Sequence, residues 1–161
     1  QAAVWSYPLV QGDVEETVFN MVSAIPFRIH QSGHLANISP ERFDAVKEGI
    51  AYYKAIRHHI PQATAIWPIG VPHMGDDWMA LGLEAEDKIY LAVWRVNSTE
   101  DTLTIPLPQL AGRQVEVTCT YPKFSTNPYR LHRASGNFAV KFPENKTARI
   151  FEFTLKEDAD A

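Results

Sequence analysis

The sequence predicts an α+β fold in which a short segment of strands and helices is followed by an antiparallel β-sandwich. Apolar residues recur at helical spacing before Pro61 and at every second position after it. Turn-forming residues separate the alternating stretches, as they do in sandwich domains. We therefore expect two domains, residues 1–61 and residues 62–161.

The first domain opens with strand, helix and strand signals. Residues 2–7 predict a short buried strand that Pro8 ends. Asp13, with Glu16 three positions later, predicts a capping box at the start of a helix. Residues 27–30 predict a second strand. This order is typical of part of a parallel α/β arrangement, and it is too short to close a barrel of eight such units.

A long helix is the strongest local prediction, over residues 40–60. Ser39 can cap its free amide groups, and Pro40 in the first position loses no hydrogen bond. Pro61 ends it, and His58 and His59 are expected to be solvated near that end. One stripe carries its apolar residues: Phe43, Val46, Ile50, Tyr53, Ile56 and Ile60.

The second domain shows a period of two along several stretches. Turn signals separate these stretches, and together they predict about eight short antiparallel strands. The clearest alternations are Met79-Leu81-Leu83, Ile89-Leu91-Val93, Leu103-Ile105, Phe138-Val140-Phe142 and Phe151-Phe153-Leu155.

Composition excludes several classes of partner. The chain of 161 residues has a formal net charge of -4, and its basic residues are scattered, so no nucleic-acid partner is expected. It has no apolar run of the ~20 residues that cross a bilayer, so no membrane partner is expected either. The single cysteine, Cys119, alternates with Val115 and Val117 as a buried strand residue would. A lone cysteine cannot form an intrachain disulfide, which favours the cytoplasm.

Candidate functional residues are few. Trp5 and Tyr7 lie at the end of the first strand, where α/β folds place ligands, whereas Trp67, Trp78 and Trp94 are expected to pack in the sheets. His30 and His34 flank a turn without further ligands, so no metal is expected.

The neighbouring carboxylates Asp76 and Asp77 suit a turn better than the facing pair that a glycosidase needs. No nucleophile elbow, phosphate loop or dinucleotide motif occurs in the sequence. We predict no catalytic residue, no metal and no cofactor.

Several motifs resemble those of glycoside hydrolase family 36 α-galactosidases. Residues 32–41 and 50–57 are similar to the turn and helix that follow the last barrel strand of that family. Residues 3–8 and 16–21 are similar to its seventh strand and the helix after it. The opening strands of the family's C-terminal sandwich resemble three further segments: residues 67–68, 78–80 and 89–95.

The resemblance implies that residues 1–61 are the last β/α units of a TIM barrel, including the long helix, and that residues 62–161 are the C-terminal sandwich. The family hydrolyses terminal α-galactosides, such as melibiose and raffinose, with retention, using aspartates on its fourth and sixth barrel strands. A chain that begins at the seventh strand, without an initiator methionine, would be a piece of a longer protein and inactive alone. Trp5, Ser6 and Tyr7 could supply a substrate contact at the rim of the parent's active site.

Two other functions remain open. An autonomous carbohydrate-binding sandwich would use Trp78 or Trp94 as a platform for a sugar ring. A small active hydrolase is the third hypothesis. For the isolated chain, unpaired barrel strands predict self-association or a rearrangement of residues 1–38.

Overall fold

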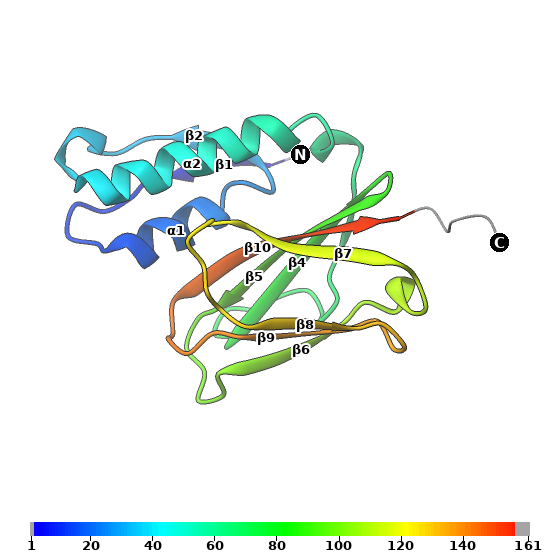
Figure 1. Cartoon of the computed structure of the whole chain (residues 1–161). Coiled ribbons are helices and arrows are strands. Elements are labelled where there is room, and N and C mark those ends of the chain that lie inside the picture. Colours follow the sequence, from blue (N-terminus) through cyan, green and yellow to red (C-terminus); the bar gives the residue numbers. More distant parts are fainter. Residues whose placement is uncertain (1, 157–161) are drawn as a thin grey trace.

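The fold has three layers (Figure 1). The computed structural model describes residues 2–156. One outer layer contains the helices α1 (Val14–Val22) and α2 (Pro40–Ile56) and the parallel pair β1 (Ala3–Ser6) and β2 (Arg28–Gln31). A five-stranded sheet forms the middle layer, and a three-stranded sheet forms the third. In the described part of the chain, no helix is long and apolar enough to cross a membrane.

The two larger sheets confirm the predicted antiparallel sandwich. The middle sheet has the order β3–β4–β5–β10–β7, and the outer sheet has the order β6–β9–β8. The strand bounds are β3 Thr64–Ile66, β4 Trp78–Ala85, β5 Lys88–Arg95, β6 Thr102–Pro106, β7 Val115–Tyr121, β8 Tyr129–His132, β9 Asn137–Lys141 and β10 Thr147–Leu155. Short 3-10 turns span Leu35–Asn37, Ile60–Gln62 and Pro108–Leu110.

The core between these two sheets is built from aromatic rings. Phe138 of β9 meets Phe151 and Phe153 of β10 edge to face, with ring centroids 5.0 and 4.9 Å apart. All three side chains are fully buried. Edge-to-face pairs add about 0.5–1.5 kcal/mol each to the burial of their apolar area. The alternating residues that predicted the strands therefore form one face of a closed sandwich.

A second core lies on the opposite face of the middle sheet, beneath the helices. Gly49 allows α2 to approach closely, because a Cβ there would lie 2.8 Å from the Met21 Cε and 3.2 Å from the Tyr121 ring. The Tyr121 hydroxyl donates to the Ala45 carbonyl at 3.0 Å. Every residue of β5 except Lys88 at its start is buried, because the middle sheet carries a core on each face.

The long helix differs from its prediction at one end and on one face. It ends at Ile56 rather than Ile60, because Pro61 would clash with the carbonyl of Arg57 in a continued helix. Phe43, predicted on the apolar stripe, is exposed, whereas Arg42 is buried. The buried face combines Val46 and Ile56 of the predicted stripe with the small residues Ala45 and Gly49.

His59 also corrects a sequence prediction. It was expected to be solvated, but its side chain is only 15% exposed. Its Nδ1 and the Tyr90 hydroxyl form a hydrogen bond of 2.6 Å. The turn after α2 is thereby attached to the middle sheet. His58 is exposed, as predicted.

One ion pair joins the helical layer to the sandwich. The buried Arg149 of β10 donates from Nη1 and Nη2 to the two carboxylate oxygens of Glu15 in α1, at 2.7 and 2.9 Å. Its Nε donates to Asn127 Oδ1 at 2.8 Å.

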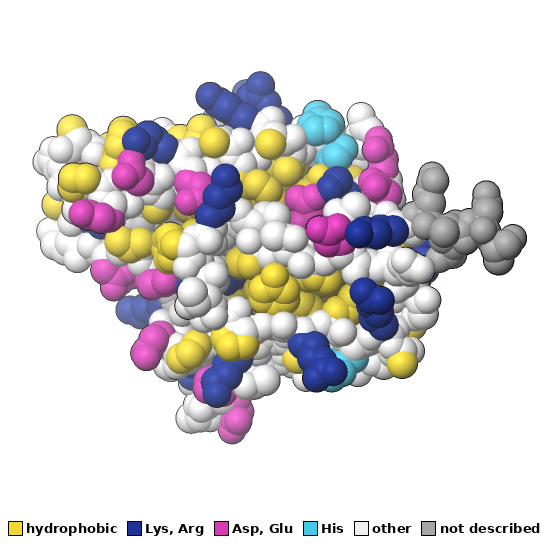
Figure 2. All heavy atoms as spheres, in the orientation of Figure 1, with side chains coloured by type: hydrophobic (Ala, Val, Ile, Leu, Met, Phe, Trp, Pro, Cys, Tyr) yellow, Lys and Arg dark blue, Asp and Glu magenta, His cyan; other side chains and the backbone are white. Residues whose placement is uncertain are grey.

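On the face shown in Figure 2, charges of both signs are interspersed rather than gathered in one stripe.

Candidate functional site

The carboxyl ends of β1 and β2 form the candidate site. The two strands are parallel, with Trp5 opposite His30 and Ser6 opposite Gln31. Successive residues of a strand point to opposite faces. The burial of Ser6 and the exposure of Trp5 show that one face of the pair is covered by the helices and the other is open.

Trp5 and His30 share the open face. Trp5 is 70% exposed. Its ring centroid lies 6.5 Å from that of His30, and the two rings are tilted by 41°. The sequence analysis considered His30 only as a metal ligand and did not expect a metal there. No cluster of three or more metal-ligating side chains occurs among residues 2–156. The sequence could have predicted that the two side chains share a face, if the alternation along both strands had been combined with parallel pairing of the strands.

Ser6 and Gln31 lie on the covered face. The fully buried Ser6 hydroxyl donates to the Asn20 Oδ1 at 2.6 Å, which ties β1 to α1. Gln31 Nε2 donates to the Ser6 carbonyl at 3.1 Å. Gln31 Oε1 is buried and has no hydrogen-bond partner within the described chain. Leaving such an acceptor unpaired costs about 1–3 kcal/mol.

Tyr7 follows directly after β1 and is 41% exposed. Its ring lies over Gly33, where a Cβ would come within 3.5 Å of three ring atoms. Gly33 also has a φ of +93°, which side-chain-bearing residues rarely adopt. The turn after β2 therefore requires glycine for its backbone and also provides a flat surface for Tyr7.

The loop from β1 to α1 is fixed by a buried arginine. Arg42 donates from Nη1 to the Val10 carbonyl at 2.9 Å, from Nη2 to the Leu9 carbonyl, and from Nε to Thr17 Oγ1 at 2.8 Å. The backbone of the loop is thus held in place. Nevertheless, Leu9 is 62% exposed and the Val10 side chain is also exposed. A rigid loop that presents apolar side chains is typical of an interface.

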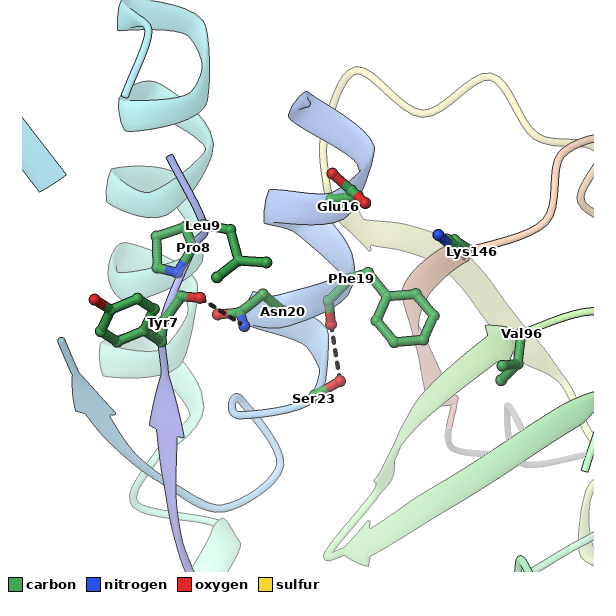
Figure 3. A pocket seen from close by; sticks show the side chains of 9 residues that line it. All are labelled: Tyr7, Pro8, Leu9, Glu16, Phe19, Asn20, Ser23, Val96 and Lys146. Atoms are coloured by element: carbon green, nitrogen blue, oxygen red, sulfur yellow. Dashed lines mark hydrogen bonds between the residues drawn. The ribbon is translucent and has the colours of Figure 1, made fainter. Parts of the chain in front are cut away.

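A groove of about 410 Å³ adjoins this loop (Figure 3). Its apolar part includes Leu9 and Phe19, together with Val96 from the sandwich side, and Glu16 and Lys146 lie along it. Asn20 Nδ2 donates to the Tyr7 carbonyl at 3.4 Å, and Figure 3 shows the Tyr7 ring at the end of the groove far from Val96. The groove therefore separates the helical layer from the sandwich.

Several carboxylates have structural partners. Asp13 and Glu16 form the predicted capping box, and the Asp76 carboxylate accepts from the His73 amide at 2.7 Å within its turn. The pKa of Glu41 is lowered by a hydrogen bond from the backbone amide of Glu41 itself, and the pKa of Asp101 is lowered by the Thr102 hydroxyl. Both shifts run opposite to the raised pKa that a general acid needs.

The remaining tryptophans and the cysteine have mixed outcomes. Trp94 is 6% exposed and its indole N–H donates to Ser23, while Trp78 packs against the Phe142 ring. Trp94 is therefore too buried to serve as an open platform in this structure, and Trp78 is only partly exposed. Trp67, predicted to pack in the sheet, is instead 38% exposed. Burial raises the pKa of the Cys119 thiol, as expected for an inert strand residue.

Comparison with known proteins finds similarity at the level of structure. No family model and no curated protein matches the sequence. The galactosidase domain of the alpha-galactosidase–sucrose kinase AgaSK superposes with a TM-score of 0.67 and 17% identity, over 95% of this chain and 22% of that one. A variant of the GH36 alpha-galactosidase AgaA from Geobacillus stearothermophilus, in complex with stachyose, gives a TM-score of 0.64 and 14% identity, over 96% of this chain and 22% of that one.

The similarity extends to other glycoside hydrolases. The alpha-amylase from Geobacillus thermoleovorans superposes with a TM-score of 0.59 and 11% identity, over 91% of this chain and 35% of that one. The chain thus has a fold that recurs in glycoside hydrolases. More particularly, this is the fold of the C-terminal region of GH36 α-galactosidases, and the chain spans about 22% of the two that are named here.

Proposed function

We propose that this chain is the C-terminal, non-catalytic part of an α-galactosidase-like glycoside hydrolase. In this proposal, residues 1–61 complete a TIM barrel and residues 62–161 form the sandwich that supports it. The full-length enzyme would hydrolyse terminal α-galactosides, such as melibiose and raffinose, in the cytoplasm. The observation that carries the proposal is the open face of the β1–β2 pair, beside a loop that is rigid yet apolar.

The open face supports a role as part of a barrel. A parallel two-stranded sheet is rarely stable alone, and parallel sheets are usually covered on both faces. Here the helices cover one face, and Trp5 and His30 occupy the other. In a completed barrel, that second face would line the interior near the carboxyl ends of the strands, where barrel enzymes place their active sites. Trp5 and Tyr7 would then lie at the rim of the site.

The buried oxygen of Gln31 supports the same proposal. It lies at the end of β2 without a donor in the described chain. The preceding barrel strands or their loops could supply that donor. Ser6 is buried and bonded to Asn20, so in the parent it would position Trp5 and Tyr7 through the strand that carries all three.

An assay of the isolated chain tests the absence of catalysis. With 4-nitrophenyl α-galactoside as substrate, we expect no release of nitrophenol above the blank, because every carboxylate of the proposed mechanism lies outside this chain. A glycosidase places its two carboxyl groups roughly 5–10 Å apart across the bond it cleaves. Turnover that tracks with the purified chain would overturn the proposal.

The same open face leads us to propose self-association of the isolated chain. The structure keeps β1 and β2 in a parallel pair, so the edges of that pair and its open face stay available to a second copy. Sedimentation velocity over a range of concentrations measures this association. A strictly monomeric chain at all concentrations would contradict it.

The division of the chain into domains at residues 61 and 62 stays a prediction. The residues on the two sides of this boundary share one apolar core.

A further inference from the structure

Trp67 stands at the free edge of the middle sheet. It follows β3, the edge strand, directly. Two hollows share its side chain, one of about 280 Å³ beside Phe27 and one of about 310 Å³ beside Pro106 and Pro108. The first is lined by apolar residues throughout, whereas the second also carries the amide side chain of Gln109.

The second hollow is formed by both sheets of the sandwich. Ile66 and Trp67 come from the end of β3, and Leu107 and Gln109 follow β6 on the other sheet. Leu107 is fully buried, and Ile66 packs against the core between the sheets. Gly82 makes room for Ile66, because a Cβ there would lie 2.5 Å from the Ile66 Cγ1. The base of the hollow is therefore fixed by the core.

Gln109, which lines this hollow, forms a polar pair with Glu84. Gln109 Nε2 donates to Glu84 Oε1 at 2.5 Å. The Gln109 side chain keeps a second N–H and its amide oxygen, and the carboxylate has a second oxygen. Together they offer one donor and two acceptors beside a partly exposed indole ring.

This combination matches the chemistry of a neutral sugar. One side of a pyranose ring presents C–H groups, which carry partial positive charge and are attracted to the negative face of an aromatic ring. The hydroxyl groups around the ring both donate and accept hydrogen bonds, so they can bind the one donor and the two acceptors of the Gln109–Glu84 pair. The carboxylate of Glu84 disfavours an anionic ligand. The hollow of about 310 Å³ is at the small end of the range for ligand sites, which suits one or two sugar units.

We propose that the hollow of Trp67, Pro106, Leu107, Pro108 and Gln109 is a neutral-saccharide binding site of the sandwich. Trp67 is its stacking platform, and Gln109, held by Glu84, is its hydrogen-bonding group. The site does not depend on the proposed barrel, because all of its residues belong to the sandwich. It assigns to Trp67 the role that the sequence had suggested for Trp78 or Trp94.

Titration of the full chain with raffinose, followed by the indole N–H signals in NMR spectra, tests this site. Trp67→Phe assigns the Trp67 signal by its disappearance. We expect the Trp67 signal to shift with a dissociation constant in the millimolar range. Followed by the backbone amide signals of Leu107 and Leu110, which every variant keeps, Trp67→Ala should weaken binding about tenfold, and Gln109→Ala about threefold, for the loss of one ring contact and one hydrogen bond.

Two controls make the result specific. Phe124→Ala removes an exposed aromatic ring that does not line this hollow and should leave raffinose binding unchanged. Far-UV circular dichroism confirms that each variant is folded. The proposal is overturned if the Trp67 signal does not shift in the folded chain, or if Phe124→Ala abolishes binding while Trp67→Ala does not. Preferential binding of a proline-rich peptide over raffinose would also overturn it. Hydrolysis of nitrophenyl α-galactoside is a separate readout, so failure here leaves the proposed parent activity to its own test.

Discussion

The two outer layers of the molecule are closed to different degrees. The three-stranded sheet and the middle sheet share a core in which Phe138, Phe151 and Phe153 are fully buried. The helical layer covers the other face of the middle sheet equally well, but its own strand pair has an open face that carries Trp5. The core between the two sheets is therefore closed, whereas the strand pair leaves one face exposed.

The contact between the two layers is expected to depend most on the Glu15–Arg149 pair. Glu15→Ala leaves the buried guanidinium without its carboxylate and should lower the free energy of unfolding by about 3 kcal/mol. Urea unfolding measures the change. The matched control is Lys47→Ala, which breaks the exposed pair with Asp44 and should cost less than about 0.5 kcal/mol. Equal effects of the two variants would show that the layers are not held together by this pair.

The close approach of α2 to the sheet gives the next largest effect. Gly49→Val places branched carbons against Met21 and Tyr121 and should destabilise the chain by about 2 kcal/mol. Gly49→Ala should be nearly neutral, because the end of the flexible Met21 side chain can move and alanine favours the helix by about 1 kcal/mol. Thermal unfolding compares the two. Similar stabilities for both variants would contradict the tight packing of the helical layer.

Alkaline pH should weaken the contact between the helical layer and the middle sheet. Burial, and secondarily the Glu152 carboxylate, raises the pKa of Tyr90 to about 12. The stability that this tyrosine contributes is present below its unfolded pKa of about 10 and is lost as pH rises through about 12. Tyr90→Phe should therefore reduce the fall in stability above pH ~10, while costing about 1 kcal/mol at neutral pH for its hydrogen bond to His59. Identical slopes for both proteins, measured by urea unfolding at each pH, would refute this.

The open face should matter least for stability and most for association. Trp5→Lys changes a side chain that is 70% exposed, so the free energy of unfolding should change by less than about 0.5 kcal/mol. We expect the self-association constant to fall severalfold. Met74→Lys is the control, because Met74 is fully exposed on the sandwich side. If both substitutions reduce association equally in sedimentation experiments, the strand pair is not the associating surface.

Local patterns predicted much of the fold from sequence. The capping box of Asp13 and Glu16, and Ser39 before Pro40, depend on residues within one helical turn of each other. Six of the eight strands of the sandwich, all except β3 and β8, followed from alternation, because one residue in two faces a core. Pro61 ended the long helix as predicted, but its effect on Arg57 moved the end to Ile56.

Contacts between distant residues could not be predicted in this way. Glu15 and Arg149 are 134 positions apart, and no local pattern indicates that they pair. The burial of Arg42 depends on where the loop carbonyls of Leu9 and Val10 fall in space. For the candidate site, the sequence suggested Trp5, Ser6 and Tyr7, whose role stays a prediction. It did not indicate the position of His30 beside Trp5, which depends on the parallel register of two strands. The exposure of Trp67 was not predicted, because Trp67 follows the edge strand β3 and alternation does not show which strand lies at an edge.

Hydrogen exchange in the isolated chain tests the difference between the middle sheet and the β1–β2 pair most directly. The amides of β5 and β10 lie between two cores and should exchange only with global unfolding, whereas those of β1 and β2 should open locally. At a concentration where the chain is monomeric, we predict much weaker protection of β1 and β2 than of β5 and β10. Equal protection of all four strands in the monomer would show that the strand pair is complete without further strands, and would contradict its proposed role as part of a larger barrel.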